Sequence, residues 1–107
     1  MRTARLILAA VVAAIATQPL RAQEPSDRQK GRLLVRQICA ECHAVGRQSL
    51  RSPNPRSPSF AAVAATPGMT EAALNAILHT SHRDMPNIIL NAQQTTEITA
   101  YILSLKR

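Results

Sequence analysis

The chain has 107 residues, of which 46% are hydrophobic but only 2% aromatic, with 13 basic and 6 acidic side chains and a formal net charge of +7. This length allows one small domain, and two cysteines are too few for a disulfide-dense fold. A multidomain enzyme and a disulfide scaffold are therefore excluded. A high charge is typical of nucleic-acid-binding proteins, but here the basic residues are scattered and only Phe60 and Tyr101 could stack on bases. We expect no nucleic-acid partner.

The first 22 residues have the features of a secretory signal peptide. Arg2 and Arg5 precede an eleven-residue apolar run at 6–16, and Leu20 and Ala22 occupy the positions that a signal peptidase recognises. The run is shorter than the roughly 20 residues that span a bilayer. We expect residues 1–22 to be removed and the mature chain to lie in the periplasm without a stable membrane span. The alternative is an uncleaved signal that holds the domain at the membrane.

The mature chain has few large apolar side chains for its core. Removing the first 22 of 107 residues leaves 85, with a net charge of +4. Of these 85 residues, 21 are apolar and larger than alanine, when the two cysteines are not counted. A domain of this size buries little surface on folding, and small domains add disulfides, metals or other staples. The composition therefore predicts that something besides side chains fills part of the core.

The first helix signal begins at Ser26, which forms a capping-box pattern with Gln29. Apolar or small residues then recur at helical spacing from Gly31 to Cys42. A glycine inside a helix costs about 1 kcal/mol relative to alanine, so Gly31 indicates that another element packs closely against this helix. The stretch 46–59 is rich in arginine, serine and proline and predicts an extended loop.

Three further helix signals follow, and no segment carries a strand signal. Ser59 is placed to cap a helix over 60–65, Thr70 to cap a second, and Asn91 begins a capping-box pattern ahead of the last. The segment 79–91 has no clear period and predicts a loop. The expected apolar faces are Leu74, Ile77 and Leu78 in the second helix and Ile98, Tyr101, Ile102 and Leu105 in the last. These patterns predict an all-α fold of three to five short helices.

Residues 39–43 read Cys-Ala-Glu-Cys-His, the spacing that attaches a c-type haem. Two thiols three positions apart near the end of a helix can bond to neighbouring corners of one porphyrin. The adjacent His43 can then bind the iron. We expect Cys39 and Cys42 to hold one haem c covalently, and such a group would supply the missing part of the core.

Other interpretations of the motif stay open. Cys39 and Cys42 could form a disulfide in an oxidising compartment, or a thioredoxin-like redox pair, although that needs a preceding strand. A zinc site would need four ligands, and those available are Cys39, Cys42, His43 and one of His79 or His82. The fourth interpretation is a chance occurrence of the spacing.

A six-coordinate haem iron needs a second axial ligand, and methionine is typical of electron-transfer haems. His79, His82 and Met85 lie downstream of the motif in the expected loop. Pro86 would stiffen the backbone beside Met85, so we expect Met85 to be the ligand and His82 to be the reserve. Met69 precedes a helix cap and is expected to pack in the core.

Taken in order, these motifs resemble a class I cytochrome c of the small bacterial monohaem type. The resemblance covers nearly all of the mature chain, through Gly31, residues 39–43, Pro58-Ser59-Phe60, residues 82–86 and residues 100–105. It implies a cytochrome c fold, in which short helices wrap around one covalently attached haem. It also implies that the first and last helices cross closely, with Gly31 against Tyr101.

The resemblance further implies that a proline carbonyl accepts a hydrogen bond from the second ring nitrogen of His43. Pro58 is the expected proline because Phe60, an apolar haem contact in the family pattern, follows two residues later. Pro55 is the alternative, because arginines and prolines replace the family's usual glycine-rich stretch. That stretch contains three arginines, namely Arg47, Arg51 and Arg56. Each of them either pairs with a haem propionate, lines a docking surface or is simply solvated.

The function that the resemblance implies is a one-electron carrier rather than an enzyme, with His43 and Met85 bound to iron in both oxidation states. Its partners would be redox proteins, and a positive charge favours acidic docking surfaces. Two alternatives remain. One is a haem enzyme or gas sensor in which the Met85 side is labile, and the other is a dedicated cytochrome subunit of a periplasmic dehydrogenase or oxidase.

Overall fold

The computed structural model describes residues 25–82 and 84–107, so the expected signal peptide at 1–22 lies outside the described residues. Within these ranges the chain forms helices and no strands, which confirms the all-α expectation. The helices are α2 (Asp27–Ile38), α3 (Phe60–Ala65), α4 (Glu71–Leu78) and α5 (Ala92–Leu103). None of the described helices is long and apolar enough to cross a membrane.

The predicted caps define where the helices begin. Each cap side chain accepts a hydrogen bond from the backbone N–H three residues further along, and the caps are Ser26, Ser59, Thr70 and Asn91. The capping boxes of α2 and α5 are complete, because Gln29 and Gln94 also accept from the cap backbone. These contacts satisfy backbone donors that a helix start leaves without partners.

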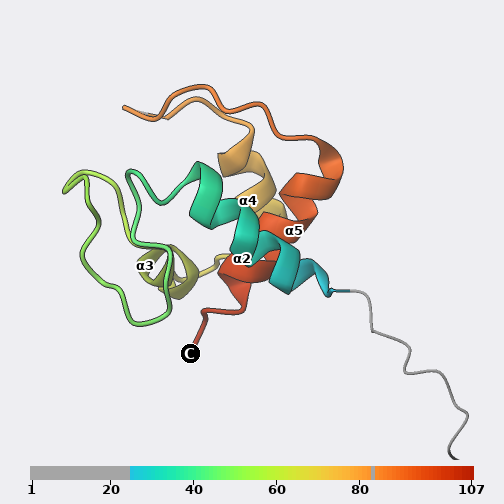
Figure 1. The fold of residues 1–107 in the computed structure, drawn as a ribbon, viewed down its shortest axis with the longest axis horizontal. Helices are drawn as coiled ribbons and strands as arrows, with labels where there is room; N and C mark the ends of the chain where they lie inside the picture. Colours follow the sequence, from blue (N-terminus) through green and yellow to red (C-terminus); the bar gives the residue numbers. More distant parts are fainter. Residues whose placement is uncertain (1–24, 83) are drawn as a thin grey trace, which may run out of the picture.

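Helix α2 packs along α5, and α3 and α4 also contact α5 (Figure 1). The α2–α5 crossing depends on Gly31. A Cβ atom added there would overlap the carbonyl oxygen of Glu97 and lie 3.0 Å from the Tyr101 Cβ. The expected approach of Gly31 to Tyr101 is present, and the backbone of Glu97 lies closer still.

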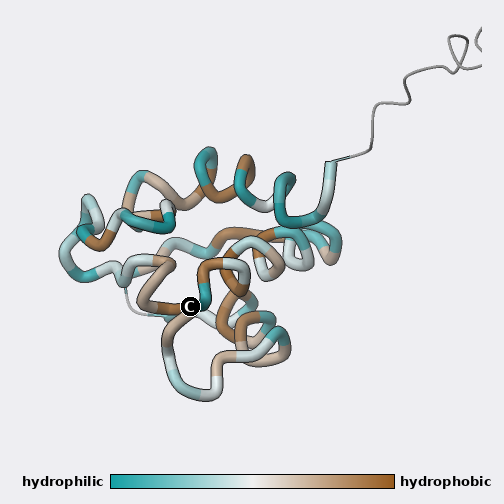
Figure 2. Tube along the Cα trace, turned by 90° about the horizontal axis from the view of Figure 1, so that it is seen from below, coloured by the Kyte–Doolittle hydropathy of each residue, from teal (hydrophilic) through white to brown (hydrophobic). Residues whose placement is uncertain are grey.

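The core lies where the helices meet, around the fully buried side chains of Val35, Leu74, Ile98 and Ile102. Along α2, next to the grey trace in Figure 2, hydrophobic and hydrophilic residues alternate with the turns of the helix. The expected apolar face of α4 is only partly buried. Ile77 is 40% exposed because it borders a cavity rather than packed side chains.

Two long loops, 46–59 and 79–91, extend to the same side of the helices, away from the first turn of α2 (Figure 1). The first follows the cysteine motif and is fastened at its base, where Arg47 Nη2 donates to the Ser104 carbonyl at 2.6 Å. The second carries Met85. The fold therefore brings the motif and Met85 to one end of the helical core.

Candidate functional site

A cavity of about 550 Å³ lies between the end of α2, the helices α3 and α4, and the two loops. All the cofactor-binding residues expected from the sequence line it, namely Cys39, Cys42, His43, Pro58, Phe60 and Met85. Much of the remaining wall is apolar, with Ile38, Val63, Met69, Leu74, Ile77, Leu78, Ile88 and Ile102. Cofactor pockets typically measure about 300–1,000 Å³ and are lined mainly by hydrophobic side chains. The cavity therefore fits a large apolar group.

A tight turn after α2 brings the motif to this cavity. The carbonyl of Cys39 accepts hydrogen bonds from the N–H groups of Cys42 (3.2 Å) and His43 (2.9 Å). Both cysteines are free, Cys39 being buried and Cys42 partly buried. Burial removes water from the Cys39 thiol and raises its pKa to about 11. A thioredoxin-like redox pair needs a preceding strand, and the described residues before the motif form helix α2 instead.

The ring of His43 is held by its neighbours. Its Nδ1 lies 2.7 Å from the Pro58 carbonyl oxygen, which is the contact expected with Pro58 rather than Pro55. A carbonyl oxygen can only accept, so Nδ1 carries the proton and, in the neutral ring, Nε2 keeps its lone pair. The Phe60 ring lies beside the imidazole, with centroids 5.1 Å apart and planes tilted by 40°. The structure thus leaves Nε2 as the nitrogen that can bind a metal.

The backbone around His43 is fixed by long-range hydrogen bonds that the sequence pattern does not reveal. Phe60 N donates to the Ala44 carbonyl at 2.9 Å, and Asn54 N donates to the Cys42 carbonyl at 3.1 Å. The Tyr101 hydroxyl, from α5, donates to the Val45 carbonyl at 2.6 Å. These bonds attach the motif to the following loop and to the last helix, so its position does not depend on α2 alone.

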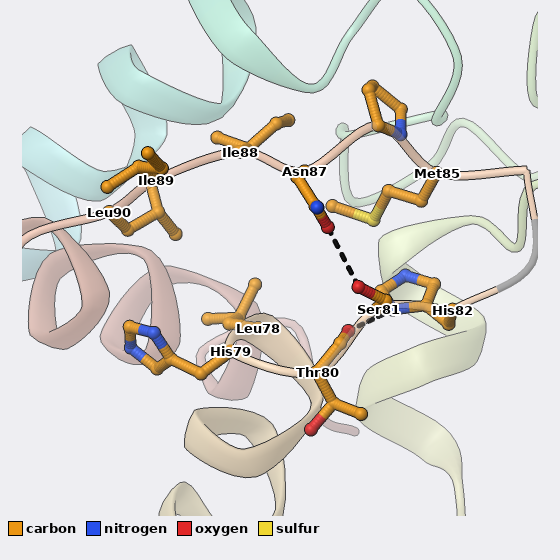
Figure 3. A pocket seen from close by; sticks show the side chains of 11 residues that line it. Leu78, His79, Thr80, Ser81, His82, Met85, Asn87, Ile88, Ile89 and Leu90 are labelled. Atoms are coloured by element: carbon orange, nitrogen blue, oxygen red, sulfur yellow. Dashed lines mark hydrogen bonds between the residues drawn. The ribbon is translucent and has the colours of Figure 1, made fainter.

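Met85 lies at the far end of the 79–91 loop, whose two arms are bridged by a hydrogen bond of 2.8 Å from Ser81 Oγ to Asn87 Oδ1 (Figure 3). The Met85 N–H donates to the His82 carbonyl at 3.1 Å, which closes a turn at the end of the loop. A second cavity of about 400 Å³ is lined by residues 78–82 and 85–90, the two arms of this loop, and Met85 and His82 line both cavities.

The other candidate ligands differ in position. His79 does not line the larger cavity, and its Nε2 hydrogen-bonds with Thr95 Oγ1 at 3.0 Å. His82 does line it, with an exposed ring whose Nδ1 lies 3.0 Å from the Thr80 carbonyl oxygen. Met69 is buried in the core as expected, and it also borders the cavity.

The three loop arginines have different surroundings. Arg56 borders the cavity and forms an ion pair with Asp84, with Nη1 and Oδ2 3.2 Å apart. Arg47 instead donates to the Ser104 carbonyl. Arg51 is exposed, and within the described ranges it takes part in no ion pair. The sequence gives no signal for the Arg56–Asp84 pair, because the two residues lie in separate loops.

Within residues 25–82 and 84–107, no three histidine, cysteine or acidic side chains are grouped closely enough to hold a metal ion, so the zinc interpretation has no ligand set there. Comparison with protein families, curated proteins and solved structures found no match. The site itself offers two thiols, one imidazole nitrogen and one thioether around an apolar space. Nitrogen and sulfur donors of this kind suit the iron of a haem.

Proposed function

We propose that residues 23–107 form a small c-type cytochrome of the periplasm, with a cytochrome c fold around one haem c, and that it carries single electrons between redox proteins. The observation that carries this proposal is that Cys39, Cys42, His43 and Met85 line one apolar cavity. The first three are adjacent in the haem-attachment spacing. Met85 comes to the same cavity from a loop more than forty positions later.

In this proposal Cys39 and Cys42 would hold the haem through thioether bonds, and His43 Nε2 and the Met85 thioether would bind its iron. Bound haem supplies a one-electron ferric–ferrous couple. Pro58 orients His43 by accepting its Nδ1 proton, and such outer contacts fix the ring and tune the metal. The apolar wall would surround much of the haem with nonpolar side chains, and such burial is a second control on the reduction potential.

We propose a carrier rather than an enzyme because His43 and Met85 would both bind the iron, which would leave no position on it for a substrate. Partners would dock near the cavity opening. Arg51 is exposed on the 46–59 loop and takes part in no ion pair within the described ranges, so its positive charge favours acidic partner surfaces.

Haem attachment tests this proposal directly. The full-length chain should be produced in a host that attaches haem c in its periplasm, and the purified protein weighed under denaturing conditions. We expect a chain that begins at Gln23 and carries one haem through two thioether bonds. The double variant C39S/C42S should carry none.

Glu41→Gln is the matched control, because Glu41 is exposed and lies inside the motif without a bonding role. This variant should carry haem as the wild type does. A wild-type chain that emerges without haem, with its two cysteines joined as a disulfide, would contradict the proposal and support the disulfide interpretation.

A further inference from the structure

The end of the loop that carries Met85 is packed less closely than the part that follows, where Ile88 packs against the core and Leu90 belongs to it. Met85 is half-buried, and the side chains of His82, Met85 and Ile88 line both the cavity of about 550 Å³ and the one of about 400 Å³. Ile89, one residue further on, is 95% exposed. A side chain with open space on either side makes few dispersion contacts. The polar contacts of the loop therefore contribute to the position of Met85.

Besides the hydrogen bond from the Met85 N–H to the His82 carbonyl, two side-chain contacts restrain this end of the loop. The Ser81–Asn87 hydrogen bond joins the two arms of the loop to each other (Figure 3). The ion pair from Asp84 to Arg56, 3.2 Å long, joins the loop to the rest of the site. Asp84 immediately precedes Met85 and has a φ of 63°, in the left-handed region that aspartate and asparagine tolerate better than most residues.

Arg56 lies two residues before Pro58, whose carbonyl accepts the His43 Nδ1 proton. The segment 56–58 therefore touches both sides of the site. Through Pro58 it orients the ring of His43, and through Arg56 it contacts the residue beside Met85. Its own backbone is held in turn, because the Arg56 N–H donates to Asn54 Oδ1 at 3.0 Å.

We propose that Arg56 and Asp84 form a latch that positions Met85 over the cavity, so that Arg56 is a positioning residue for the second axial ligand. The role of Met85 in this inference rests on the proposed function. Breaking the pair leaves Met85 in place as a residue but allows its loop to move away from the cavity more often. An outside ligand then competes with Met85 more successfully.

The latch is weak and sensitive to salt. The Arg56 side chain is 74% exposed and that of Asp84 39%, and exposed ion pairs shift an equilibrium by about 2- to 5-fold. The Debye length falls from about 30 Å at 0.01 M ionic strength to about 3 Å at 1 M. The effect of the pair should therefore be measurable at low salt and absent at high salt.

The test is a titration of the haem-loaded ferric protein with imidazole, which competes with Met85 for the iron. At low salt, R56Q and D84N should each bind imidazole about 2- to 5-fold more tightly than the wild type. Asparagine tolerates the left-handed backbone at position 84, so D84N removes the charge without adding strain. The double variant R56Q/D84N should match the single variants, because they remove the same interaction.

Arg56→Lys keeps the charge and should restore most of the wild-type affinity. Arg51→Gln is the matched control, because Arg51 is exposed on the same loop and has no ion pair within the described ranges. Equal imidazole affinities in the wild type, R51Q, R56Q and D84N would overturn the proposal. Additive effects of R56Q and D84N would also overturn it.

Amide hydrogen exchange across residues 79–91 provides a readout that does not depend on the iron ligand. Exchange at low salt should be about 2- to 5-fold faster in R56Q and D84N than in the wild type and R51Q. If the wild type lacks methionine ligation, the proposed function fails. Amide hydrogen exchange then tests by itself whether the Arg56–Asp84 pair restrains the loop. Unchanged exchange in both variants would then overturn the latch.

Discussion

One hydrogen bond selects the ring nitrogen of His43 that can bind a metal. Because the Pro58 carbonyl accepts from Nδ1, the lone pair of the neutral ring lies on Nε2. The sequence pattern predicted this contact through the spacing of Pro58 and Phe60, with Pro55 as the alternative. The competing proline could be rejected only from the structure, because the path of an arginine- and proline-rich loop does not follow from local preferences.

At the same scale, Tyr101→Phe tests the attachment of the motif to α5. It removes the hydroxyl that donates to the Val45 carbonyl at 2.6 Å. We expect the free energy of unfolding to fall by about 1 kcal/mol, the usual net value of such a bond, as measured by denaturant titration of the haem-loaded protein. Thr96→Ala is the control, because it removes an exposed hydroxyl from the same helix and should change stability by less than about 0.5 kcal/mol. Equal losses in both variants would argue against a role for the Tyr101 bond.

Among the elements, the α2–α5 crossing sets the distance between the two halves of the core. In an open helix, replacing Gly31 by alanine would stabilise by about 1 kcal/mol. Here the new Cβ would overlap the Glu97 carbonyl oxygen, which is backbone and cannot move alone. Helix propensity alone predicts that the substitution stabilises the protein, but the contact with Glu97 makes it destabilising.

We expect Gly31→Ala to destabilise the protein by about 2–3 kcal/mol, as overpacked cores do, with a matching fall in the thermal midpoint of the haem-loaded protein. Gly46→Ala is the control, because the nearest atom to its added Cβ, the Ser49 Cβ, lies 3.6 Å away in ordinary contact. A thermal midpoint for Gly31→Ala equal to or above that of the wild type would show that the helices do not cross this closely.

The helices and their starting residues were predictable because caps act locally. Each of Ser26, Ser59, Thr70 and Asn91 bonds to a backbone group three residues away. The contacts that assemble the site were not predictable in this way. Arg56 and Asp84 belong to separate loops, and Ile77 has helical spacing but faces a cavity. Such pairings depend on how the loops fold over the core, which local patterns do not encode.

At the scale of the whole molecule, the sequence has few large apolar side chains, and the structure has a large cavity where more of them would be needed to fill the core. Without a bound group the apolar walls of this cavity stay in contact with water, and each Å² of apolar surface left uncovered forgoes about 25 cal/mol of stabilisation. Domains are stable by about 5–15 kcal/mol in total. If a cofactor fills this cavity, the chain without it should therefore have little stability left.

We expect the haem-free C39S/C42S chain to lose most of its helical circular dichroism at 25 °C, while the haem-loaded wild type retains it. Haem-loaded Glu41→Gln is the control, because it carries a substitution within the motif but keeps both cysteines. A haem-free chain that unfolds cooperatively at the wild-type temperature would show that the core is complete without a cofactor.

The visible spectrum of the purified protein, oxidised and reduced, is the most direct test of the central claim that His43 and Met85 both bind a haem iron. It should be recorded with Met85→Ala and, as the matched control, Met69→Ala, since Met69 borders the same cavity. We predict a low-spin, methionine-ligated spectrum in the wild type and Met69→Ala, reversible one-electron reduction, and no carbon monoxide binding. Met85→Ala should lose the methionine signature and bind carbon monoxide. A high-spin ferric wild type, or a wild-type spectrum that persists in Met85→Ala, would contradict the claim.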